Sequence, residues 1–174
     1  MLAMGFVQSI KVCLSKYVVF SGRATRSEYW WFALFVILSS IVLAFLDQAI
    51  FGTNPDTGEG ANVLNSGFQL AVFLPMLAAG WRRLHDTGRP GWYLLLPLAL
   101  GLATMIALLS GVAVFSVLEG GVDDPEALRG PAAFLGLSGM IVVWGLQLVL
   151  SIMMIWWLTR PSQEGDNAYG PPAA

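Results

Sequence analysis

Four long stretches of this chain are almost free of charged side chains, and this feature limits what the chain can fold into. They cover about 30–51, 63–81, 91–118 and 132–158. The third and fourth contain no charged residue, and the first has none before Asp47. A helix that is apolar on every side has no polar face for water, whereas in a bilayer it satisfies its own backbone hydrogen bonds. About 20 apolar residues suffice to span the hydrocarbon.

Composition supports the same interpretation. The chain is 56% hydrophobic and only 11% charged, whereas an ordinary soluble domain carries roughly 25% charged residues. A soluble chain with so few charges could not cover its surface with polar groups. We therefore expect an all-α polytopic membrane protein, a four-transmembrane-helix bundle that forms one membrane domain over 1–174. The alternative is three spans, with 63–81 only dipping into the bilayer.

The basic residues predict the orientation of the spans. Of the nine lysines and arginines, only Arg129 falls on one side of the predicted membrane. The positive-inside rule assigns the opposite side, which holds the other basic residues and both termini, to the cytoplasm. Tryptophans at the same ends of the spans, such as Trp30 and Trp156, agree with an aromatic belt there. The loops 52–62 and 119–131 on the far side are short and acidic.

The two ends of the chain lie outside the spans. Residues 2–19 repeat apolar side chains at a spacing near four, with Lys11 on another face, which predicts an amphipathic helix. Such a helix can lie in the interface plane or pack on the protein's own helix ends, and the sequence favours neither. The tail 159–174 is polar and rich in proline. We expect it to be too short to fold alone.

Small residues recur at every fourth position of the third stretch, at Ala99, Ala103, Ala107 and Gly111. In a membrane, such a stripe lets helix backbones approach closely. The facing surface on the fourth stretch could be Ala132, Gly136 and Gly139. We expect packing within the chain in preference to a dimer interface.

Three polar segments on the predicted cytoplasmic side carry a family resemblance. They are Gly22-Arg23-Ala24-Thr25-Arg26-Ser27-Glu28-Tyr29-Trp30, Arg82-Arg83-Leu84-His85-Asp86, and Gly165-Asp166-Asn167-Ala168-Tyr169-Gly170-Pro171 in the tail. In this order they resemble the bacterial family known as domain of unknown function 805, which consists of small inner-membrane proteins. The resemblance implies an inner-membrane location and no established activity.

The candidate site consists of the charged residues and the histidine that lie in or just after the first two segments, near the predicted cytoplasmic headgroups: Arg23, Arg26, Glu28, Arg82, Arg83, His85, Asp86 and Arg89. The carboxylates could bridge arginines and hold the helix ends together. Surplus arginines could hold anionic lipid headgroups, or an arginine pair could bind a phosphate-bearing ligand. We favour these three interpretations in that order.

No catalytic, nucleotide-binding or metal-binding motif is recognisable in the chain. His85 is the only histidine, and one histidine without clustered cysteines or carboxylates does not make a zinc site. With Asp86 it could form an acid–base pair, although a structural role is the simpler interpretation. We predict no catalytic residue, no cofactor, no metal and no nucleic-acid partner.

The leading functional prediction is a non-enzymatic inner-membrane protein whose cytoplasmic face engages anionic lipid or a protein partner, with a homo-oligomer as a further option. The alternative is a small oligomeric transporter or channel that uses helix kinks or breaks at Pro75 and Pro97. Apart from Asp47, however, the spans lack the ionisable residues that ion-coupled transporters use. A membrane enzyme that uses His85 and Asp86 comes third.

Overall fold

The structure, a computed structural model, describes residues 4–53, 60–119 and 126–173. The side chains of 112, 113, 116–119, 126–135 and 137 also fall outside the described part. Leu2 of the predicted N-terminal helix, the middle of both predicted outer loops, and the side chains of Arg129 and Ala132 therefore lie outside the described residues.

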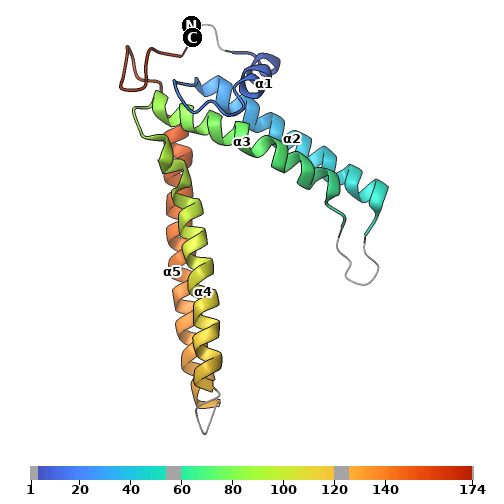
Figure 1. Ribbon diagram of the computed structural model, residues 1–174, viewed down its shortest axis with the longest axis vertical. Helices are drawn as coiled ribbons and strands as arrows, with labels where there is room; N and C mark the ends of the chain where they lie inside the picture. Colours follow the sequence, from blue (N-terminus) through green and yellow to red (C-terminus); the bar gives the residue numbers. More distant parts are fainter. Residues whose placement is uncertain (1–3, 54–59, 120–125, 174) are drawn as a thin grey trace. The chain divides into compact units, whose positions relative to one another are not determined.

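Within the described residues the chain is helical (Figure 1), in the order α1 (Phe6–Ser15), α2 (Arg26–Phe51), α3 (Val63–Asp86), the 3-10 helix η1 (Gly91–Leu95), α4 (Leu96–Glu119) and α5 (Glu126–Thr159). Four segments of this part are long and apolar enough to cross a membrane: Arg26–Phe51, Val63–Asp86, Gly91–Gly111 and Ser138–Thr159. The predicted all-α fold with four spans is confirmed. The elements form two compact units, Met1–Tyr93 with Leu158–Ala174, and Leu94–Trp157.

The start of α2 is set by a threonine cap. The Thr25 hydroxyl accepts a hydrogen bond from the Glu28 backbone N–H at 3.1 Å, which satisfies one of the unpaired donors of the first turn. The spacing of Thr25 and Glu28 is that of a capping box, but the Glu28 side chain pairs with Arg82 instead. Because Thr25 caps this turn and Arg82 pairs with Glu28, the helix begins at Arg26, before the apolar stretch that was predicted to start at about 30.

The start of α3 is capped by a side chain of the neighbouring helix. Asp47, fully buried in α2, accepts hydrogen bonds from the backbone N–H groups of Leu64 and Asn65 at 2.8 and 2.9 Å. The positive end of the α3 dipole lies at the same place and favours the carboxylate there. Asp47 therefore ties the start of α3 to α2.

Replacing Asp47 with alanine will lower the free energy of unfolding by about 1–2 kcal/mol, the usual cost of losing an N-cap. The measurement is thermal unfolding in detergent micelles, followed by tryptophan fluorescence. Asp47→Asn is the matched control, because it keeps an acceptor oxygen and should lose less. Equal losses in both variants would contradict the capping role.

The helix α3 continues past the end of its apolar run at Trp81 and ends at Asp86. It also continues through Pro75, so the helix is not broken at that residue. After Thr87, Gly88 adopts φ +72°, a conformation that favours glycine, and its N–H donates to the His85 carbonyl at 3.0 Å. The chain then turns into η1. Pro97 is the second residue of α4, a first-turn position that tolerates proline.

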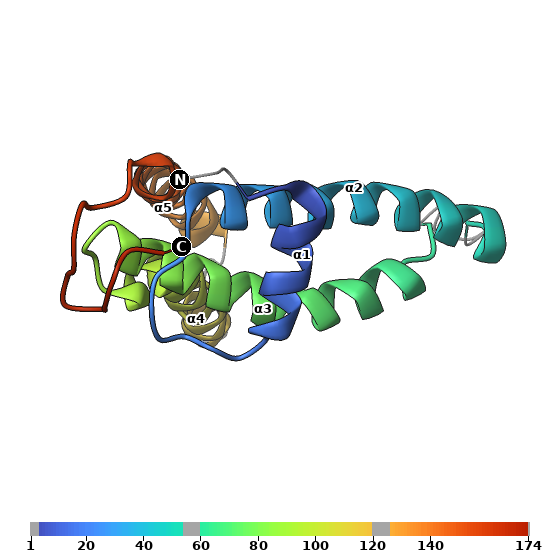
Figure 2. The same cartoon turned by 90° about the horizontal axis from the view of Figure 1, so that it is seen from above.

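The helix α1 contacts both α2 and α3 and crosses over them in Figure 2. Its Ser9 hydroxyl donates to the Ser27 carbonyl at 3.3 Å, and the Phe6 ring meets Trp31 edge to face at 5.7 Å. The Tyr17 hydroxyl, just beyond the helix, donates to the Ala71 carbonyl. The helix ends at Ser15, earlier than the predicted 19.

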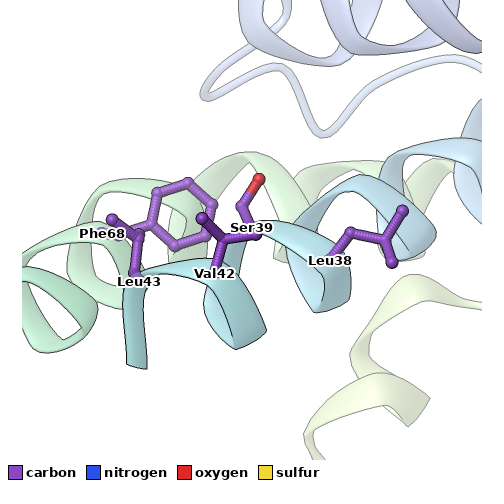
Figure 3. A pocket seen from close by; sticks show the side chains of 5 residues that line it. All are labelled: Leu38, Ser39, Val42, Leu43 and Phe68. Atoms are coloured by element: carbon purple, nitrogen blue, oxygen red, sulfur yellow. The ribbon is translucent and has the colours of Figure 1, made fainter. Parts of the chain in front are cut away.

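Farther along, α2 and α3 leave a shallow apolar groove between them. Gln69 of α3 donates to the Ser40 hydroxyl of α2 at 2.7 Å, and Phe35 meets Phe68 edge to face at 6.1 Å. The groove, of about 370 Å³, is lined by Leu38, Ser39, Val42, Leu43 and Phe68 (Figure 3). Four of these residues belong to α2, and Phe68 belongs to α3.

The second unit contains α4 and most of α5. A groove of about 960 Å³ is lined by residues of both helices, among them Ala103, Ala107 and Gly111 of α4, and Gly136 and Gly139 of α5. Most of the predicted small-residue stripe therefore faces this groove, whereas Ala99 does not line it. The Thr104 and Ser110 hydroxyls in its wall donate to carbonyls one turn back in α4, so both are satisfied without a partner helix.

Candidate functional site

The candidate site lies where the loop before α2, the end of α3 and the tail meet. We name it the arginine cluster, and it consists of Arg23, Glu28, Arg82, Arg83, His85 and Asp86. Gly22, at φ +82°, turns the loop so that Ala24 N donates to the Arg82 carbonyl at 3.1 Å. All six cluster residues are buried, and Arg82, Arg83 and Asp86 have at most 1% of their surface exposed.

Asp86 joins two arginines that are far apart in the sequence. Its Oδ1 accepts from Arg23 Nε at 2.9 Å, and its Oδ2 accepts from Arg83 Nη1. All three side chains have no exposed surface. Breaking a buried ion pair by removing one partner costs about 3–5 kcal/mol, because the remaining charge is left uncompensated. Asp86 is therefore the central counter-charge of the cluster.

Glu28 and Arg82 form a second buried pair beneath α1. Arg82 Nη1 donates to Glu28 Oε1 at 2.6 Å, and the Cys13 thiol of α1 lies 3.8 Å from the Glu28 carbonyl oxygen. Burial, and then the negative charge of Glu28, raise the pKa of Cys13 to about 12, against the opposing effect of Arg82. The thiol therefore stays protonated near neutral pH, and we assign it a packing role in place of a reactive one.

Arg83 caps the end of α5. Its Nε donates to the Leu158 carbonyl at 3.0 Å, and its Nη2 donates to the Arg160 carbonyl. The last carbonyls of a helix lack partners in the helix and carry about half a negative charge in total. Because the cluster buries one more arginine than carboxylates, these carbonyls supply part of the missing negative charge.

The tail docks on the cluster through its backbone. Arg23 Nη2 donates to the Gln163 carbonyl at 2.5 Å, and Nη1 donates to the Gly165 carbonyl at 2.7 Å. Asn167 Nδ2 donates to the His85 carbonyl at 2.9 Å. The Tyr169 ring stacks on His85, with centroids 3.8 Å apart and planes 4° apart. These contacts were not predicted from the sequence, although Asn167 and Tyr169 belong to the tail motif that carries the family resemblance.

Not every candidate residue belongs to the cluster. Arg26 is exposed, and among the described residues it forms no ion pair. Arg89 is half-buried and donates to the Thr87 carbonyl at 3.2 Å. The carboxylate oxygens of Asp86 both face arginines, while His85 Nδ1 lies 3.1 Å from the Gly22 carbonyl oxygen. The sequence-adjacent His85 and Asp86 therefore do not form an acid–base pair.

Metal binding has no support in the described ranges, where no three His, Cys, Asp or Glu side chains are grouped closely enough to hold an ion. One arginine of the cluster has buried N–H groups without an acceptor in the described part of the chain. Arg82 Nε and Nη2 are buried and have no partner among the described atoms. These two N–H groups form the side-on fork of the guanidinium, the edge that arginine uses for bidentate binding.

The spans and the cluster together define a polytopic α-helical membrane protein in which buried ion pairs and backbone contacts join three distant segments. Residues 17–171 match the model of DUF805, a family described as proteins of unknown function. The chain belongs to this family, and the predicted resemblance is confirmed.

Two relatives are named inner membrane proteins. The chain is 46% identical to inner membrane protein YhaH of Escherichia coli (strain K12) over 83 residues, which are 48% of this chain and 66% of that protein. It is 44% identical to inner membrane protein YhaI of the same strain over 85 residues, 48% of this chain and 64% of that protein. The chain spans just under two thirds of the length of these relatives. No solved structure matches the chain.

Proposed function

We propose that this protein is a non-enzymatic inner-membrane protein whose helix α1 rests on the cytoplasmic leaflet and engages anionic lipid headgroups. In this proposal both termini and the arginine cluster lie on the cytoplasmic side, which follows from the distribution of lysine and arginine. The observation that carries the proposal is the outward face of α1.

The outward face of α1 combines apolar side chains with lysines. Val7 is 61% exposed and Leu14 42% exposed, and Lys11 lies exposed between them. Just beyond the helix, Lys16 is exposed as well. A helix with such a face lies in the interface plane, with its apolar side chains at the acyl boundary and its lysines among the headgroups. The opposite face of α1 packs on α2. In this proposal α1 therefore lies in the membrane interface and also packs on the protein's own helices, the two roles between which the sequence did not decide.

The arginine cluster itself is occupied. Arg23, Arg82 and Arg83 are buried and hold carboxylates, carbonyls or both, which supports the structural interpretation of these residues. Arg26, exposed at the start of α2, is the candidate arginine that remains accessible. We therefore place the lipid contact on Lys11, Lys16 and Arg26.

The geometry gives less support to the other functions. An acid–base enzyme would need His85 and Asp86 to act together, but Asp86 is engaged by two arginines. An ion-coupled transporter would need an ionisable group free to bind its ion within the spans. Asp47 is instead occupied by the backbone N–H groups of α3.

Replacing Lys11 and Lys16 with glutamine will weaken the retention of phosphatidylglycerol. Each basic residue near an anionic surface contributes about 1 kcal/mol, so we expect about a fivefold loss of affinity for each lysine. The measurement is native mass spectrometry of the protein released from nanodiscs of mixed lipid composition. Arg129→Gln is the matched control, because it removes a positive charge on the predicted opposite side. Unchanged retention in the lysine variants would contradict the proposal.

A further inference from the structure

The segment 163–170, here called the tail strap, covers the one face of Arg23 that does not meet Asp86. Arg23 uses Nε for Asp86, while both terminal nitrogens donate to carbonyls of the strap. The strap itself makes a turn in which Asn167 and Gly170 exchange backbone hydrogen bonds of 3.2 and 3.1 Å. The two terminal nitrogens of a guanidinium form a fork that matches two oxygens of a phosphate.

We propose that the tail strap is releasable, and that its release opens a binding site for a phosphate group on Arg23. The carbonyls of Gln163 and Gly165 occupy the positions that two phosphate oxygens would take. His85, freed from Tyr169, would line the same site, since its ring lies against the strap. The inference rests on the proposed function in one respect, namely that anionic lipid is the leading source of the phosphate.

Two observations favour displacement of the strap from Arg23 by a phosphate group. First, its acceptors toward Arg23 are neutral carbonyls, whereas a hydrogen bond to an ionised acceptor is roughly twice as strong. Second, most strap residues are exposed, and the strap is held by hydrogen bonds and one ring stack rather than by buried apolar side chains. Segments with few buried apolar contacts open at a low free-energy cost.

The negative charge of the strap also favours its replacement on Arg23 by an anionic lipid headgroup. Glu164 and Asp166 are exposed, and neither carboxylate contacts a cluster arginine in the described structure. Near an anionic leaflet these carboxylates are repelled, while Arg23 is attracted. Asp86 remains on Arg23 Nε throughout, so the arginine stays positioned when the strap leaves.

The test uses the full chain with a spin label on Ala168→Cys, an exposed strap position. Cys13 is buried with a raised thiol pKa, and labelling of the unsubstituted chain measures its background. We expect an immobile label in phosphatidylcholine nanodiscs and a mobile one when phosphatidylglycerol is included. Inorganic phosphate added to phosphatidylcholine nanodiscs separates the sources. Release by both anions supports a soluble phosphate as a ligand, and release by the lipid alone supports the headgroup. A label that stays immobile with both anions overturns the proposal.

Two controls separate this inference from simple screening and from the proposed function. Sodium chloride at matched ionic strength should leave the label immobile, and equal release by chloride would overturn the phosphate site. Tyr169→Ala removes the ring stack without changing charge, so it should raise the fraction of molecules in which the strap is released. The apparent Kd for phosphate should fall in proportion as this fraction rises. Unchanged phosphate binding in that variant also overturns the proposal. The double variant Lys11→Gln, Lys16→Gln should still release the strap when inorganic phosphate is added. This result distinguishes a failure of the proposed lipid contact of α1 from a failure of the phosphate site on Arg23.

Discussion

Replacing Asp86 with asparagine will lower the free energy of unfolding by about 3–5 kcal/mol, because two buried arginines lose their shared counter-charge. Asp86 contacts Arg23 through one oxygen and Arg83 through the other, and none of the three side chains is exposed. Asparagine keeps the size of the side chain and one acceptor oxygen, so the loss reports charge and not a cavity. We expect a markedly lower midpoint of thermal unfolding in detergent micelles.

The matched control for this prediction is Asp166→Asn, which makes the same chemical change at an exposed position of the tail. Surface substitutions of this kind usually change stability by less than about 0.5 kcal/mol. If the two variants unfold together, Asp86 is not the counter-charge that holds the cluster. A large loss in Asp86→Asn alone supports the ion-pair network as the main stabilising contact between the loop and α3.

Substituting Gly91 by alanine is the second prediction with a large effect. An added Cβ at Gly91 would overlap the ring of Trp81 at Cδ1 and Nε1. Because the ring meets Phe20 edge to face at 5.6 Å and also lies against His85, its displacement disturbs packing next to the cluster. Overpacking of this kind costs about 1–3 kcal/mol. Thermal unfolding and the tryptophan emission maximum should both change.

Gly101→Ala provides the comparison, because nothing lies within 4 Å of a Cβ at that position in α4. Alanine is favoured over glycine inside a helix by about 1 kcal/mol, so this variant should be neutral or slightly more stable. Destabilisation of both variants by the same amount would mean that the Trp81 contact has no special role.

The sequence predicted the spans and the family well, because both depend on local patterns. Apolar runs of spanning length are visible without knowledge of the fold, and the family motifs are short contiguous segments. The helix ends were predicted less accurately than the number of spans. Each predicted stretch ended where its apolar run ended, whereas the helix itself can continue into charged residues. The backbone of α3 continues for a further turn to Asp86 because its charges are paired within the protein.

The partners within the cluster could not be predicted, because they depend on packing between distant segments. Glu28 and Asp86 were natural counter-ions, but their assignment to Arg82 and to Arg23 with Arg83 requires the three-dimensional fold. The arginines were expected near the lipid headgroups at the membrane surface, but three of them, Arg23, Arg82 and Arg83, are buried. The tail shows the largest difference, since backbone carbonyls, which every sequence possesses, make most of its contacts with Arg23.

The contacts of Arg23 and Arg83 have a consequence for biosynthesis. Both arginines belong to segments that the ribosome makes early or midway along this sequence, whereas the carbonyls of Leu158, Gln163 and Gly165 are made after them. Until these carbonyls have been made, both arginines lack acceptors that they have in the folded protein. A chain terminated just before Leu158 therefore keeps almost the whole of each apolar stretch, but its Arg23 and Arg83 guanidinium groups lack these acceptors.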